Sequence, residues 1–383
     1  MKRYKLLNNV LGWVVFVIAA VTYILTLEST ASFWDCGEFI ASGYKLEVGH
    51  PPGNPIFMLT ARFFANFASS PSEVAYMVNL MSGLLSAATI LLLFWTITRL
   101  AQKIVLRDGE TEETMSLGQM IAILGCGLVG ALAYAWSDTF WFSAVEGEVY
   151  AYSSFCTALV FWLILKWESV ADLPHANRYI ILIAYIIGVS IAVHLLNLLC
   201  IPAIVLVYYY RKYKNTDLKG SLIALLVSFV LIVLLLYGLV PGFVEVASWV
   251  ELLFVNVFHL PFNSGVVFYF FLIVGVIAWA IYETYAQRSD KLIKISFLIS
   301  IVLVGIPFIG DGYIIGIVLT AALAYYLFTR KKLAVVAMNT ILLSLFVIFI
   351  GYSSYALIVI RSTANTPMDQ NSPEDIFLSL IHI

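Results

Sequence analysis

Charged residues are scarce in this chain of 383 residues. Only 11% of the residues are Asp, Glu, Lys or Arg, whereas 62% are hydrophobic and the mean hydropathy is +0.96. Soluble globular domains contain about 25% charged residues, so the composition excludes that class and predicts a polytopic membrane protein whose first partner is the lipid bilayer. The lysines and arginines form no basic tract, and we therefore expect no nucleic-acid partner.

Cysteine is also rare. The four cysteines have no metal-type spacing, and most of them fall inside apolar runs, so neither a disulfide framework nor a cysteine metal centre is expected. The N-terminus has basic residues before an apolar run, as a signal peptide does, but no small-residue cleavage pattern follows. The sequence therefore predicts a retained first helix.

Long apolar runs fill most of the chain. A spanning helix needs about 20 apolar residues, and this criterion predicts about eleven spans and an all-α fold. They lie near 10–27, 74–98, 118–136, 149–166, 179–192, 195–210, 220–240, 264–282, 292–309, 313–329 and 333–352.

The distribution of basic residues predicts the orientation of these spans. With the N-terminus in the cytoplasm, only Lys45, Arg62 and Arg361 of the 21 Lys and Arg fall on the outer side. This asymmetry is what the positive-inside rule demands. It predicts a multi-pass protein of the cell inner (plasma) membrane with an outer, periplasmic face rich in carboxylates.

The first outer loop, 28–73, contains the clearest candidate for chemistry. Asp35 and Glu38 are three residues apart, so a helix over this segment would bring both carboxylates to one face. His50 opens a run with two prolines and a glycine that stops the helix, and it is a candidate for substrate binding. The alternative is an ordinary polar loop whose short helix lies on the lipid headgroups.

A second acidic cluster lies between the third and fourth spans. Glu146 and Glu148 are separated by one glycine, and two carboxylates spaced in this way can converge on a cation or on sugar hydroxyls. The alternative is a polar hairpin anchored at the membrane surface by aromatic residues. Because both clusters are predicted on the same side of the membrane, we favour a shared site.

Three further polar residues are candidates for substrate binding. His194 and Asn197 interrupt an apolar run, and polar groups inside a membrane are costly enough to suggest a role, although a structural hydrogen bond explains them equally well. Arg361 follows the last span, where a guanidinium can bind a lipid phosphate. A side chain that only reaches toward the membrane surface is the alternative.

The chain becomes polar after the last span. We predict a transmembrane domain over 1–360 and the start of an outer-side extension, apparently truncated, over 361–377. The hexapeptide 378–383 matches the in-frame translation of a common sequencing adapter, which predicts a non-native tail.

Several motifs together carry a resemblance to a known family. They are FWDCGEF, GHPPGNP, WFSAVEGEVYA, VHLLNLL and IRSTANTPMDQNSPED, spread over the whole chain. In this combination the sequence resembles a large family of bacterial multi-spanning membrane proteins. That family is similar to the animal transmembrane protein O-mannosyltransferase and to the GT-C glycosyltransferases.

The resemblance implies a GT-C-like helical bundle with a helical first outer loop. It also implies a glycosyltransferase that moves a sugar, mannose being one candidate, from a polyprenyl-phosphate donor to a serine or threonine hydroxyl of an acceptor protein. Asp35 would be the catalytic base with Glu38 as its partner, and Glu146, Glu148 and Arg361 would bind substrates. The resemblance implies no required cofactor. Whether the two acidic clusters share a divalent cation is left open by the sequence.

A secondary transporter and an inactive member of the same family are the alternatives. Transporters place their ion and substrate sites near the membrane midplane on broken helices. Here nearly all predicted outer acids lie in loops, and His194 is the one ionisable group deep in a predicted span. This distribution favours the enzyme.

Overall fold

Every secondary-structure element that the structure describes is a helix. The structure is a computed structural model that describes residues 2–107, 109–309 and 313–382. The chain divides into two compact units: 1–49, 54–171 and 190–200 form the first, and 50–53, 172–189 and 201–383 form the second.

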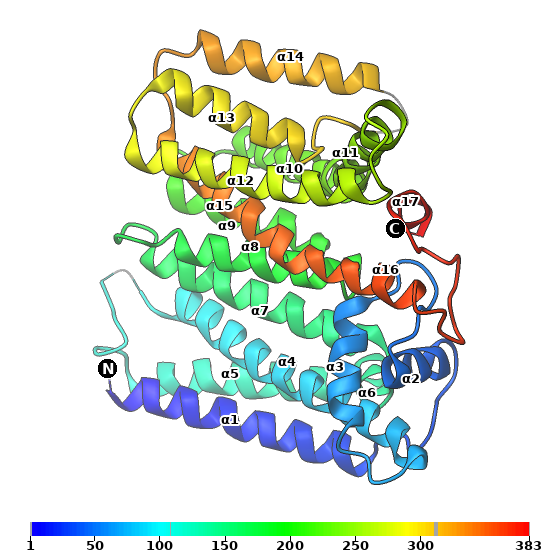
Figure 1. The fold of residues 1–383 in the computed structure, drawn as a ribbon. Helices are drawn as coiled ribbons and strands as arrows, with labels where there is room; N and C mark the ends of the chain where they lie inside the picture. Colours follow the sequence, from blue (N-terminus) through cyan, green and yellow to red (C-terminus); the bar gives the residue numbers. More distant parts are fainter. Residues whose placement is uncertain (1, 108, 310–312, 383) are drawn as a thin grey trace. The chain divides into compact units, whose positions relative to one another are not determined.

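The first unit is organised around its longest helix. It contains α1 (Lys2–Leu25), α2 (Cys36–Lys45), α3 (Pro55–Ala65), η1 (Pro71–Glu73), α4 (Val74–Val105), α5 (Leu117–Ala135), α6 (Asp138–Ala144), α7 (Val149–Val170) and η2 (Leu195–Cys200). Helix α4 packs against α1, α3, α5 and α7, and Figure 1 shows α1, α4, α5 and α7 as neighbouring rods. Its side chains Ile90 and Phe94 are fully buried among residues of α1 and α5.

The second unit contains the remaining helices. They are α8 (Arg178–Ile191), α9 (Ile201–Lys212), α10 (Leu218–Val233), η3 (Leu234–Leu239), α11 (Val240–Leu252), η4 (Leu253–Val257), α12 (Ser264–Ala286), α13 (Asp290–Leu303), α14 (Tyr313–Thr329), α15 (Val335–Tyr352), η5 (Ser353–Tyr355), α16 (Ala356–Ser362) and α17 (Ile376–His382). Helix α12 packs against α11, α13 and α15. Helices α8 and α15 cross closely, since a Cβ at Gly188 would lie 2.5 Å from the Ile348 carbonyl oxygen. Small residues allow such close crossings between membrane helices.

The all-α polytopic class predicted from composition is confirmed. Within the described ranges, eight helical segments are long and apolar enough to cross a membrane. The predicted number of eleven is not confirmed, because three predicted spans form helices α8, α13 and α14 of only 14, 14 and 17 residues. At 1.5 Å per residue these three are shorter than a hydrocarbon core of about 30 Å. The domain boundary predicted at residue 360 and the non-native tail predicted at 378–383 stay predictions. Residue 383 lies outside the described residues.

Two short helices form the first predicted outer loop. Helix α2 is amphipathic and buries Cys36, Phe39 and Ile40. The Phe39 ring packs edge-to-face on Phe57 of α3, with ring centroids 5.3 Å apart. Phe39 is therefore a core residue of the protein rather than an anchor at the membrane surface, whereas Trp34 is 89% exposed.

The packing of α2 on α3 depends on a small residue. A Cβ at Gly43 would lie 2.7 Å from the Cβ of Ala61, so any side chain there must push the two helices apart. A Cβ at Gly37, six residues earlier in α2, would have its nearest neighbour at 3.9 Å. The two glycines thus provide a matched pair in one helix.

We expect Gly43→Val to destabilise the protein by about 1–3 kcal/mol, the usual cost of overpacking a core. Gly37→Val is the matched control and should be nearly neutral, because the space there is open and valine favours helix no less than glycine does. Thermal unfolding of both variants in detergent measures the difference. Equal melting temperatures for Gly43→Val and wild type would show that α2 does not pack on α3 as described.

Candidate functional site

Four carboxylates from two separate loops gather in the first unit. Asp35 is the N-cap residue of α2, and Glu38 lies in its first turn. Glu146 and Glu148 lie between α6 and α7, where Glu148 is the N-cap of α7 and accepts a hydrogen bond from the Val149 amide. Cys36 joins the two loops.

The Cys36 thiol contacts both glutamates of the second loop. Its Sγ lies 3.6 Å from Glu146 Oε2 and 3.8 Å from Glu148 Oε1, and the side chain is fully buried. Burial and the two neighbouring carboxylates raise the pKa of the Cys36 thiol, so it stays protonated and donates to them. A residue that showed no metal-type spacing in the sequence is therefore the link between the acidic loops.

The two glutamates are removed from water. Glu146 is 4% exposed and Glu148 is 5% exposed. Burial raises the pKa of Glu148 to about 7, and the negative charges of Glu146 and Asp35 add to the rise. Burial also raises the pKa of Glu146, although hydrogen bonds from Ser32 and Cys36 oppose that rise. At neutral pH, therefore, Glu148 can hold or release a proton.

Asp35 and Glu38 lie at the rim of this cluster. Asp35 is exposed and Glu38 is half-buried, and oxygen atoms of the two carboxylates lie within 4.8 Å of each other. That spacing allows both to contact one substrate group or one cation. A Cβ at Gly49 would lie 2.6 Å from Glu38 Oε1, so the segment that follows α2 packs directly on this carboxylate.

A buried asparagine of α4 holds the first loop in place. The Asn79 side chain donates to the backbone oxygen of Glu28 at 2.7 Å and to that of Thr30 at 3.0 Å. The Glu28 amide in turn donates to the Val145 oxygen of the second loop at 3.1 Å. Asn79 was not among the residues predicted to be functional, although an asparagine inside an apolar run was a visible signal.

The glycine between the two glutamates is closely packed. A Cβ at Gly147 would lie 3.0 Å from Asn79 Oδ1 and 3.1 Å from carbon atoms of Ile40 and Val78. The φ angle of Gly147 is not in the left-handed region, so its backbone conformation does not require glycine. The glycine instead lets the second loop lie directly against α2 and α4.

His194 and Asn197 also belong to the first unit. The His194 ring lies 5.5 Å from the Tyr150 ring, and its Nδ1 accepts from the Leu196 amide at 3.1 Å. Asn197 is 1% exposed, and both polar atoms of its side chain are without a hydrogen-bond partner among the described residues. Tyr150 follows Glu148 by two residues, so His194 lies at the same end of α7 as the carboxylates.

His50 and Arg361 are half-buried residues of the second unit. Arg361 is in the last turn of α16, and His50 accepts from the Gly53 amide through its backbone oxygen at 2.8 Å. Their contribution to substrate binding stays a prediction.

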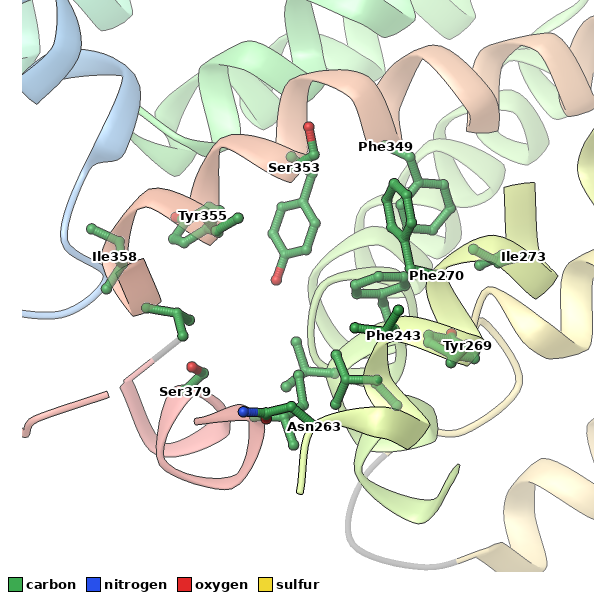
Figure 2. Close-up of a pocket in the computed structure, with 18 of the residues that line it drawn as sticks. Phe243, Asn263, Tyr269, Phe270, Ile273, Phe349, Ser353, Tyr355, Ile358 and Ser379 are labelled. Atoms are coloured by element: carbon green, nitrogen blue, oxygen red, sulfur yellow. The ribbon is translucent and has the colours of Figure 1, made fainter. Parts of the chain in front are cut away.

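The second unit contains an apolar cavity of about 670 Å³. Figure 2 shows Phe243, Phe270 and Phe349 on one side of it and Tyr355 and Ile358 on the other. The volume and the apolar lining of this cavity are typical of sites that bury a small organic ligand or part of a lipid chain.

The raised pKa of Glu148 makes stability depend on pH. Its folded pKa of about 7 exceeds the ordinary 4.5, so the folded state binds more protons between these values and stability falls as pH rises through this window. Glu148→Gln cannot ionise and still accepts from the Val149 amide. We expect it to be more stable than wild type at pH 8 by about 2 kcal/mol, allowing for solvent screening, and to differ little at pH 4.5.

Thermal unfolding from pH 4.5 to 8 measures this effect. Glu113→Gln, at an exposed acid remote in sequence from both loops, is the matched control and should follow the wild-type profile. The buried Glu146 still contributes to the dependence of stability on pH in this variant. The plot of stability against pH for Glu148→Gln should therefore become shallower but not flat. Identical profiles for Glu148→Gln and wild type would contradict the burial argument.

Comparison with known proteins identifies relatives of this region. Residues 35–217 match the family model described as "Protein O-mannosyl-transferase TMEM260 N-terminal domain". The chain is 27% identical over 209 residues to a mouse protein named "Protein O-mannosyl-transferase TMEM260", which is 55% of this chain and 27% of that protein. It is 23% identical over 189 residues to the Dictyostelium discoideum protein of the same name, covering 48% of this chain and 20% of that protein.

The matched segments thus span only about a quarter of the length of these curated relatives. No solved structure matches the chain significantly. The matched region begins at Asp35 and contains Cys36, Glu38, Glu146 and Glu148. Over residues 35–217, which include both acidic loops, the chain is therefore similar to the N-terminal domain of the protein O-mannosyl-transferases of this family.

Proposed function

We propose that this chain is an integral-membrane glycosyltransferase that transfers a sugar, mannose by analogy with its named relatives, to a serine or threonine hydroxyl of a protein. The observation that carries the proposal is the convergence of Asp35, Cys36, Glu146 and Glu148 from two loops within the region similar to protein O-mannosyl-transferases. The donor is a polyprenyl-phosphate sugar, and the acidic loops face the outer, periplasmic side of the inner membrane.

In this reaction the acceptor hydroxyl oxygen attacks the anomeric carbon of the sugar. A new carbon–oxygen bond forms as the bond from the anomeric carbon to the lipid phosphate breaks, and the phosphate leaves with the bonding electron pair. A hydroxyl is a weak nucleophile, so a carboxylate must accept its proton during the attack. Asp35 takes this role because it is exposed at the rim of the cluster, where an acceptor can reach it.

The buried carboxylates position the base and the substrates. Glu148, with its raised pKa, is partly protonated at neutral pH and limits the repulsion that a third full charge would exert on Asp35 and Glu146. Glu38 and Glu146 bind sugar or acceptor hydroxyls, as do His50, His194 and Asn197. Arg361 binds the phosphate of the donor, because a guanidinium matches phosphate oxygens in pairs.

The second unit supports a lipid-linked donor. Its apolar cavity of about 670 Å³ has the aromatic and aliphatic lining that a hydrocarbon chain requires (Figure 2). Lipid phosphate is an adequate leaving group, so no metal is needed for this step. The spacing of Asp35 and Glu38 also permits a divalent cation to bind there.

Asp35→Asn keeps the size of the side chain but cannot accept a proton. We expect the transfer rate from a polyprenyl-phosphate sugar to a Ser/Thr peptide to fall about 10²- to 10⁴-fold, as is usual when a general base is lost. Asp138→Asn, at an exposed acid of α6, is the control and should keep wild-type activity. Full activity in Asp35→Asn would remove this residue from the mechanism and point to Glu38 as the base instead.

The proposed orientation is tested by labelling. In a background without native cysteines, a cysteine at exposed Ser69 should react in intact cells with an impermeant thiol reagent. A cysteine at exposed Lys331 should react only after the membrane is permeabilised. Labelling of the Lys331 position in sealed cells would overturn the proposed topology.

A further inference from the structure

A second cavity lies at the end of the first unit that is remote from the carboxylates. It has a volume of about 470 Å³ and is lined by the first turns of α1 and the last turns of α4 and α7, with Glu112 from the segment after α4. Lys166 of α7, which lines it, is eighteen residues from Glu148 at the start of the same helix. That separation is about 27 Å along the axis, so this cavity cannot share the substrate group bound by the carboxylates.

Three cationic side chains and one carboxylate line the cavity. The cations are Lys5, Arg99 and Lys166, and the carboxylate is that of Glu112. Lys5 Nζ lies 3.8 Å from a carboxylate oxygen of Glu112, so this ion pair balances the charge of Lys5. Arg99 donates to the neutral amide oxygen of Gln102 at 3.4 Å, and this bond does not balance the charge of its guanidinium.

Two tryptophans form an amphipathic wall of the cavity. The Trp95 and Trp162 rings have centroids 5.8 Å apart, and Lys166 Nζ lies 4.7 Å from the centroid of Trp162. The Trp95 Nε1–H group donates to the Asn8 oxygen at 3.4 Å. Tryptophan beside lysine and arginine is typical of the level at which a membrane helix meets lipid headgroups.

The position of the cavity along the helices agrees with the level of the lipid headgroups. Helices α1, α4 and α7 all lie in segments that are long and apolar enough to span a membrane, and the cavity is at the ends of these segments. Phosphate headgroups lie just beyond the hydrocarbon core, and basic pockets between membrane helices bind them.

We propose that this cavity binds the phosphate headgroup of an anionic phospholipid. Arg99 and Lys166 contact the phosphate, and the two tryptophans cover the glycerol and the first methylene groups of the lipid. The site is independent of the proposed transferase activity, because it lies at the opposite ends of the same helices.

Native mass spectrometry of the purified full chain in detergent tests the proposal, with phosphatidylglycerol, phosphatidylcholine and glycerol phosphate as probes. We expect phosphatidylglycerol to bind more tightly than phosphatidylcholine, and Arg99→Gln or Lys166→Glu to weaken it about fivefold or more for each charge removed. Lys166 is exposed, so we expect its substitution to leave the fold intact. Lys331→Gln and Lys331→Glu, at an exposed lysine of the second unit, are the matched controls for loss and reversal of charge and should bind as wild type does.

Three outcomes would overturn the proposal. Equal affinity for phosphatidylglycerol and phosphatidylcholine would show that the charge of the headgroup is not recognised. Unchanged binding of phosphatidylglycerol to Lys166→Glu and to a folded Arg99→Gln protein would place any bound lipid elsewhere. Glycerol phosphate binding as tightly as phosphatidylglycerol would assign the cavity to a soluble phosphate ester.

Discussion

The burial of negative charge between two loops is the constraint on which the candidate site depends. Glu146 and Glu148 are nearly inaccessible to water, and a carboxylate in such a place favours its protonated form unless donors surround it. The Cys36 thiol supplies a weak donor to both. The site is therefore held near the point where a proton can be gained or lost at neutral pH, rather than at the low pKa of an exposed glutamate.

The scaffold around α4 maintains this arrangement. Asn79 fixes the backbone of the first loop, and Gly147 allows the second loop to approach α2 and α4 closely. Burying an amide in an apolar helix is costly unless it is hydrogen-bonded, and the two bonds from the Asn79 amide nitrogen to the loop backbone offset part of that cost, while Asn79 Oδ1 has no hydrogen-bond partner among the described residues. The same helix carries Arg99 at its other end, so one rigid element of 32 residues supports two chemically opposite surfaces.

The two surfaces have different relations to the membrane. The acidic one is closed by protein side chains and leaves only Asp35 exposed, which suits a reaction that must exclude water from most of its charged groups. The basic one is an open cavity beside tryptophans, which suits a ligand that stays in the lipid layer. In these two proposals, anionic lipid and transferase chemistry occupy opposite ends of α1, α4 and α7.

The sequence by itself determined the class of the protein, the approximate positions of the apolar helices, and the two acidic segments around Asp35 and Glu146. These properties are local: hydropathy over about 20 residues reports a membrane helix, and carboxylates in an apolar chain are conspicuous wherever they occur. The predicted number of spans was not confirmed, because α8, α13 and α14 are apolar but short.

Only the tertiary structure decided that Cys36 lies between Glu146 and Glu148, that Asn79 holds the first loop, and that Lys5, Arg99 and Lys166 line one cavity. The physical reason is that these contacts join residues from 49 to about 160 positions apart, and their energies depend on burial and packing that no local pattern records.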